Sequence, residues 1–129
     1  MSPDFRVERL DHVHITSPAE LEEEVIAWYE QTLSLSLIDK PEGTQPRGAW
    51  FSLGGQELHI SRDEHNPPHL SHFGLVVDDL DAVVATLREA GCHIEQATQI
   101  PGRRRFYTRD PAGNRIEFLT LDGAEADRA

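Results

Sequence analysis

The sequence contains two segments of about 60 residues that resemble each other in their order of polar and apolar positions. The first opens with LDHVHI at residues 10–15 and ends in ELHI at 57–60, while the second opens with LSHFGL at 70–75 and ends in RIEF at 115–118. His12 and His72 are 60 positions apart, and His59 and Glu117 are 58 apart. A repeat of this size in a chain of 129 residues predicts two half-domains that share one core.

Each repeat has the pattern of one strand, one helix and three further strands. Strands are expected at residues 10–16 and 73–77, and short strands at 35–38 and 92–95. Ser17 followed by Pro18 and Glu20 predicts a capping box for the first helix, and Asp78 or Asp79 is the expected cap of the second. The second helix should stop at Gly91, whose counterpart in the first repeat is position 34. Hairpins are expected at 49–60 and 105–119.

These elements predict an α+β fold in which two βαβββ modules form a curled eight-stranded mixed sheet with the helices outside. We expect one domain over residues 1–129. Its first module covers about 8–62, a connector covers 63–69, the second module covers about 70–121, and a tail covers 122–129.

Composition restricts the partners of the chain. The formal net charge is −11, which disfavours nucleic acids and anionic membranes and would suit a basic ligand. The only cysteine is Cys92, so an internal disulfide is impossible, and a reduced, cytoplasmic setting fits best. Nothing resembles a signal peptide, and no apolar run reaches membrane-spanning length.

Alternation along the strands places potential metal ligands on shared faces. His12 and His14 point to one side of their strand, as does His59 on the last strand of the first repeat. Glu117 lies on the corresponding face of the second repeat, opposite the apolar positions that pack under the helices. If the sheet curls, these polar faces line one cleft, and the symmetric donors predict one metal site built from both repeats.

The hairpins predict which side chains flank these ligands. The two-glycine turn at 54–55 places Trp50 opposite His59, and the longer second turn would place Phe106 opposite Glu117 if it keeps the equivalent register. Within the basic run 103–105, alternation from Phe106 makes Arg104 the expected inward-facing residue. Arg104 could hold an anionic substrate group, or the run could be a solvated loop that offsets nearby carboxylates.

Four phrases carry a resemblance to a known family. They are LDHV at 10–13, WY at 28–29 followed by LSL at 33–35, GGQELH at 54–59, and DPAGNRIEF at 110–118. The chain resembles the vicinal oxygen chelate superfamily, which includes glyoxalase I, fosfomycin-resistance enzymes, extradiol dioxygenases and bleomycin-binding proteins. The resemblance implies paired βαβββ modules, a divalent metal in a U-shaped cleft and a homodimer.

The resemblance places the metal ligands at His12, His59, His72 and Glu117. His59 departs from the pattern, because glyoxalase I typically has glutamate there and methylmalonyl-CoA epimerase, another member of the superfamily, has glutamine. His59 is therefore either a fourth ligand or a cleft histidine that hydrogen-bonds substrate or water. His14 stands where the fosfomycin enzymes usually have threonine, and it is expected to contact substrate. The expected substrate-binding residues are His14, Trp50, Arg104 and Phe106.

Imidazole and carboxylate donors suit zinc, nickel, cobalt, iron or manganese better than calcium. The leading interpretation is a metal-dependent, glyoxalase-like lyase or isomerase that acts on a small oxygenated substrate, with Glu117 and His59 as the catalytic residues. One alternative is an extradiol-type dioxygenase with iron held by His12, His72 and Glu117. The other is a non-catalytic protein that binds a basic drug. The sequence leaves open whether the modules pair within a chain or swap across a dimer.

Overall fold

The structure, a computed structural model, describes residues 4–122. It confirms two βαβββ modules in succession, and the greater part of the expected tail, 123–129, lies outside the described residues. The first module comprises β1 (His12–Ser17), a 3-10 turn (Ala19–Leu21), α1 (Glu22–Ala27), a π-helical turn (Trp28–Thr32), β2 (Ser36–Ile38), β3 (Ala49–Leu53) and β4 (Gln56–Arg62). The second module comprises β5 (His72–Val76), α2 (Leu80–Glu89), β6 (Glu95–Gln96), β7 (Arg103–Arg109) and β8 (Arg115–Leu121).

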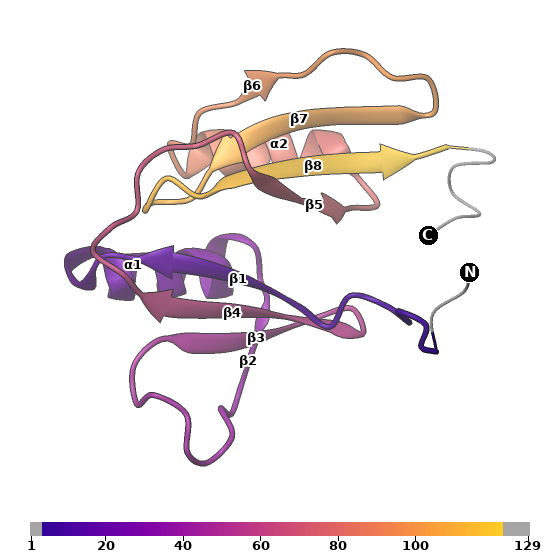
Figure 1. Cartoon of the computed structure of the whole chain (residues 1–129). Helices are drawn as coiled ribbons and strands as arrows, with labels where there is room; N and C mark the ends of the chain where they lie inside the picture. The colour runs from indigo at the N-terminus through magenta and orange to yellow at the C-terminus, as the bar shows by residue number, and fades with distance from the viewer. Residues whose placement is uncertain (1–3, 123–129) are drawn as a thin grey trace.

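The strands form two four-stranded mixed sheets rather than one continuous sheet of eight. Their orders are β1-β4-β3-β2 and β5-β8-β7-β6, so each module makes the same sheet. In each, the first and last strands of the module are parallel neighbours, and the remaining pairs are antiparallel. Figure 1 shows β1 and β5 as the edges at which the two modules meet, with both helices behind the sheets.

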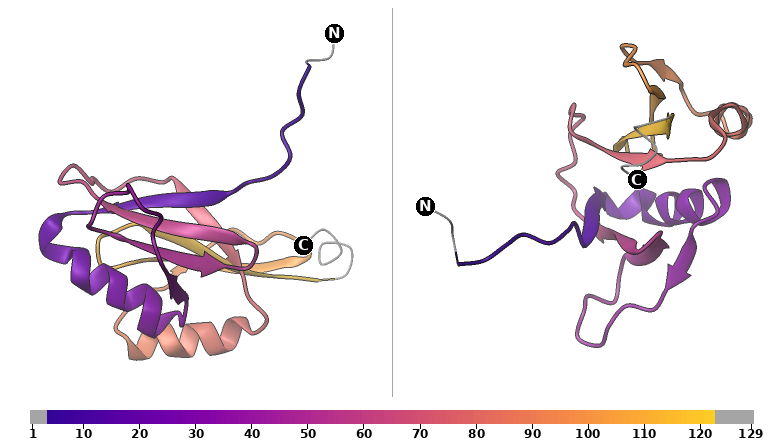
Figure 2. Two further views of the ribbon diagram at one scale, coloured as in Figure 1. Left: turned by 90° about the horizontal axis from the view of Figure 1, so that it is seen from below. Right: turned by 90° about the vertical axis from the view of Figure 1, so that its right-hand side faces the viewer.

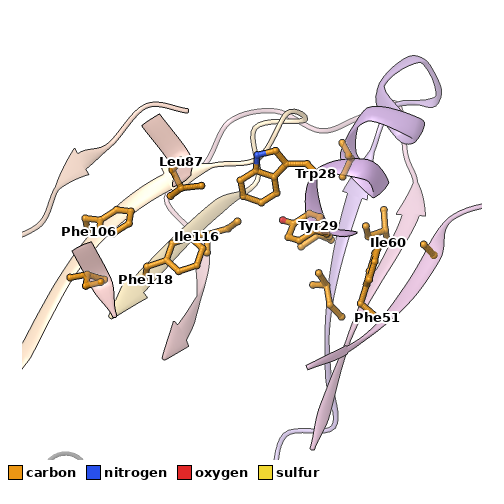
Figure 3. Close-up of a cluster of buried hydrophobic side chains, with 13 residues drawn as sticks. Trp28, Tyr29, Phe51, Ile60, Leu87, Phe106, Ile116 and Phe118 are labelled. Carbon is orange, nitrogen blue, oxygen red and sulfur yellow. The ribbon is translucent and has the colours of Figure 1, made fainter. Parts of the chain in front are cut away.

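The modules are joined by side-chain packing rather than by a strand ladder. Their buried apolar residues form a single cluster, in which Tyr29, Phe51, Leu58, Leu87 and Ile116 are the largest fully buried hydrophobic side chains. Figure 3 shows the side chains of the second module on one side of this cluster and those of the first on the other. The apolar positions predicted to pack under the helices therefore do form the core. No helix within residues 4–122 has the length and apolar character that crossing a membrane requires.

The helix ends follow the sequence signals only in part. The predicted capping box is wrong, because Ser17 belongs to β1 and its hydroxyl donates to the Pro18 carbonyl, 2.9 Å away. The cap of α2 is confirmed, since the Asp79 carboxylate accepts a hydrogen bond from the Ala82 N–H. Ser34 and Gly91 both have positive φ, 58° and 79°, which confirms that these two positions correspond.

Polar contacts also cross the junction between the modules. The Tyr29 hydroxyl donates to the Asp110 carboxylate over 2.7 Å, and the Trp28 indole donates to the Cys92 sulfur over 3.3 Å. The Asn114 side-chain amide donates both to the Asp110 carboxylate and to the Thr16 carbonyl. Burial raises the pKa of Asp110 although hydrogen bonds from Asn114 and Tyr29 oppose the shift, and burial raises the pKa of Tyr29 well above its ordinary value.

Gly48 marks a close approach between the loop before β3 and strand β4. Its φ is +83°, and a Cβ there would lie 2.1 Å from the Ile60 carbonyl oxygen. We expect Gly48→Ala to lower the free energy of unfolding by about 3 kcal/mol, because the clash adds to the strain of a positive φ. Urea unfolding measures the loss. Gly43→Ala is the matched control, since Gly43 has φ +90° with open space around it, and a loss of about 1 kcal/mol is expected there. Equal losses in the two variants would contradict the proposed clash.

Candidate functional site

The first sheet carries a stack of three rings on its polar face. Trp50 on β3 pairs with His59 on β4, as predicted from the two-glycine turn, and their rings are parallel at 3.7 Å. The His12 ring from β1 stacks on the other face of His59 at 4.1 Å. His59 is largely buried, and its Nε2 donates to Glu57 Oε1 over 2.9 Å. His12 Nδ1 donates to Asp11 Oδ2, and this hydrogen bond holds the pKa of Asp11 below its ordinary value.

His14 lies on the same face as His12 but has a different partner. Its Nε2 is hydrogen-bonded to the Ser61 hydroxyl, 2.5 Å away on β4. His14 and His72 both line a small cavity of about 210 Å³ between β1 and β5. The structure therefore brings His14, rather than His12, toward the second module.

The second sheet carries a cluster of five polar side chains on the equivalent face. His72 Nε2 on β5 donates to Glu117 Oε1 on β8 over 3.1 Å. Arg105 on β7 lies 3.6 Å from the same carboxylate oxygen and donates to the Tyr107 hydroxyl over 2.8 Å. The Tyr107 ring meets the His72 ring edge-on at 4.9 Å, and the Arg115 guanidinium lies 3.7 Å above the Tyr107 ring.

The expected pairing of Phe106 with Glu117 is wrong by one residue. Tyr107 pairs with Glu117, while Phe106 pairs with Phe118, is 3% exposed and belongs to the core. The cause is the turn, in which the Asp110 N–H donates to the Asn114 carbonyl and Arg109 pairs with Arg115. A shift of one residue exchanges the two faces of a strand.

The same shift corrects the choice of arginine. Arg104 points toward the helix side, where it pairs with Asp81 of α2 over 3.1 Å and its side chain is 63% exposed. Arg105 occupies the polar face instead, beside Glu117. The sequence signal that could have shown this is Asp110 itself, since an aspartate that accepts hydrogen bonds from residues 112 and 114 fixes the length of the turn.

The four proposed metal ligands lie in two pairs, His12 with His59 and His72 with Glu117. Within residues 4–122 of one chain, no three histidine, cysteine, aspartate or glutamate side chains converge closely enough to hold a metal ion. Figure 2 shows the helices on the inner side of the angle between the sheets, so the polar faces point away from each other. Three imidazoles and one carboxylate nevertheless have the donor chemistry of a transition-metal site.

The sequence pattern of the Glyoxalase/Bleomycin resistance protein/Dioxygenase superfamily matches residues 9–118. The chain therefore belongs to this superfamily, and the resemblance inferred from its motifs is confirmed. No curated protein matches the chain.

Solved structures of similar proteins agree with the fold. A glyoxalase family protein from Bacillus anthracis is 34% identical, with 93% of this chain and 100% of that chain covered and a TM-score of 0.84. Lactoylglutathione lyase from Agrobacterium tumefaciens is 21% identical, with 88% and 94% covered and a TM-score of 0.69. An antibiotic-binding protein from a Streptomyces species is also 21% identical, with 92% and 99% covered and a TM-score of 0.73.

Proposed function

We propose that this protein is a divalent-metal-dependent enzyme of the glyoxalase type, a lyase or isomerase that acts on a small oxygenated substrate. One observation carries the proposal: each sheet presents a contacting pair of ligand-type side chains at equivalent places on its polar face. These are His12 with His59 on the first sheet, and His72 with Glu117 on the second. Zinc, nickel, iron, cobalt and manganese all suit such donors.

We further propose that the site is completed by two copies of the chain. The two pairs lie on polar faces that diverge within one chain, and β1 and β5 are both edge strands. A homodimer with two-fold symmetry would bring the first pair of one copy to the second pair of the other, and would form two identical sites.

The residues around the pairs suggest their roles. A divalent cation bound there would act as a Lewis acid, stabilising the negative charge that builds on a substrate oxygen. Glu117 could take a proton from a carbon beside a carbonyl and return it to the neighbouring carbon. His59 is held by Glu57 and could hold a second proton, while His14, steadied by Ser61, could contact substrate. The Trp50 ring would supply an apolar wall.

Complementation between two inactive variants tests the shared site. His12→Ala damages only the first pair, and Glu117→Gln damages only the second. Neither homodimer should bind metal at full affinity. After unfolding and refolding together, half of the dimers should be mixed, and each mixed dimer has one intact site of two. About one quarter of the sites should therefore regain metal, measured by elemental analysis after dialysis. A mixture that regains none contradicts sharing between two copies.

The identity of the metal separates the reaction classes. Protein purified without chelators should contain zinc, nickel, cobalt or manganese if it transfers protons. Iron together with oxygen uptake on catechols would instead indicate the dioxygenase.

A non-catalytic binding protein is the second candidate, and the net charge of −11 is the observation that favours it, because that charge attracts cations. The antibiotic-binding protein from Streptomyces shares the fold. Protein that takes up no divalent metal, yet binds a cationic drug, would support this candidate over the enzyme.

A further inference from the structure

Two arginines on the polar face of the second sheet are largely removed from water, although the chain as a whole is strongly acidic. The side chain of Arg105 is 12% exposed and that of Arg115 is 11% exposed. A guanidinium group loses much of its hydration at such positions, so its donors need acceptors nearby. Glu117, a carboxylate of comparable burial, lies 3.6 Å from Arg105 and also accepts from His72.

The partners of these two arginines leave part of their hydrogen-bonding capacity unused. Arg105 donates to the Thr98 carbonyl through Nε and Nη2, but its contact with Glu117 is 3.6 Å, longer than a hydrogen bond. Arg115 donates to the Leu70 carbonyl and pairs with Glu95 over 3.2 Å. Within residues 4–122, the buried Nε of Arg115 finds no hydrogen-bond partner. Glu95 is half exposed, so water screens its charge.

Tyr107 joins the two arginines into one group. Its hydroxyl oxygen accepts from Arg105, so its own hydrogen remains available, and among the described residues it has no acceptor. The Arg115 guanidinium lies over the same ring at 3.7 Å. Two guanidinium groups and one phenolic donor thus lie in one contacting group, in which Arg105 is 3.6 Å from Glu117. Planar, forked donors of this kind match the oxygen atoms of an oxyanion.

We propose that Arg105, Tyr107 and Arg115 form a binding subsite for an oxyanion, either a carboxylate or a phosphoryl-type group, carried by the substrate. The inference rests on the proposed function in naming the substrate class: a small oxygenated acid whose reacting atoms lie next to its anionic group. The two guanidinium groups disfavour a cationic ligand at this end of the site, although the net charge of the chain would attract one.

Binding of small anions to the metal-free protein tests the subsite without any assay of activity. The probes are acetate, inorganic phosphate and methylphosphonate, with acetamide as the neutral control, all at one ionic strength set with sodium chloride. Titrations are followed by calorimetry and by the arginine Nε–H signals in ¹⁵N NMR. We expect saturable binding of at least one oxyanion, with shifts of the Arg105 and Arg115 signals. Preference for acetate identifies a carboxylate, and preference for the phosphorus compounds identifies a phosphoryl-type group.

Variants decide whether the binding belongs to this cluster. Arg105→Gln and Arg115→Gln should each raise the Kd about tenfold or more, because each removes a charged donor. Tyr107→Phe should raise it severalfold. Arg104→Gln is the matched control, since this arginine lies on the helix side of the same strand, and its Kd should equal that of the wild type. If a glutamine variant fails to fold, Tyr107→Phe and Arg115→Lys carry the test, because phenylalanine keeps the ring and lysine keeps a long cationic side chain without the forked donors.

Two results would overturn the subsite: probes that shift no arginine signal beyond chloride alone, or an Arg104→Gln variant that loses as much affinity as Arg105→Gln. The experiments on metal binding can contradict the proposed enzyme function without affecting the proposed subsite. If the protein binds oxyanions here but takes up no metal, the proposed enzyme function is wrong and the proposed subsite stands. If it binds metal but no oxyanion, the proposed subsite is wrong and the proposed enzyme function stands.

Discussion

Replacing Glu117 by glutamine is expected to abolish turnover and to weaken metal binding about 10-fold to 100-fold, with the fold intact. Glu117 is the only carboxylate among the four proposed ligands, and it contacts both His72 and Arg105. The amide keeps the shape of the side chain, so packing survives. It carries no charge and cannot take up a proton at neutral pH, so metal binding is weakened and the base is lost.

Metal affinity is measured by calorimetry, and folding is measured by circular dichroism. Turnover is measured with the substrate that the wild-type protein accepts. Glu89→Gln, on the exposed side of α2, removes the same charge from the same module and should leave all three unchanged. An unaltered rate in Glu117→Gln would rule out the proposed role of this carboxylate.

Asp110→Ala is expected to lower the free energy of unfolding by about 3–5 kcal/mol, because it leaves several buried donors without an acceptor. The Asp110 carboxylate accepts from the Tyr29 hydroxyl, from the Asn114 side chain and from the backbone N–H groups of Ala112 and Asn114. These bonds shape the β7–β8 turn and tie it to the first module. Urea unfolding measures the loss. Asp110→Asn keeps one oxygen for the backbone donors and should lose clearly less, so equal losses would contradict this explanation.

The same residue predicts a pH dependence. Because burial raises the pKa of Asp110 in the folded state, its contribution to stability is greatest below the pKa of the unfolded chain, about 3.9, and is lost as the pH rises through the folded-state pKa. The stability of the wild type relative to Asp110→Asn should therefore fall as the pH is raised from about 3 to about 6. A difference that stays constant or grows over this range would contradict the raised pKa.

The sequence predicted register only where a turn has a single common geometry. A two-residue turn made of two glycines fixes which residues of a hairpin face each other. The pairing of Trp50 with His59 therefore followed directly from it. The second turn is longer, and its register depends on which backbone groups Asp110 accepts. The sequence pattern therefore places Phe106 on the polar face, whereas the structure places Tyr107, the next aromatic residue of the same strand, there.

The repeat predicted the modules but not how they meet. Alternation assigns a ligand to one face of its own strand, and the structure confirms that His12 and His59 share a face. His72 was placed by the family resemblance, and the structure puts it beside Glu117. The angle between the sheets depends on how residues such as Trp28 and Tyr29 pack between modules, and no local pattern contains that information. One continuous sheet was expected for that reason, where two are found.

The parallel rings of Trp50 and His59 give this protein a built-in optical reporter. An indole in van der Waals contact with an imidazole senses any new charge placed next to that imidazole, through the field on its π-electrons. Trp28, the other tryptophan, lies in the core beside Cys92 and is shielded from such events. The fluorescence emission of Trp50 should therefore change when a charged group binds next to His59 on the first sheet, without any added label.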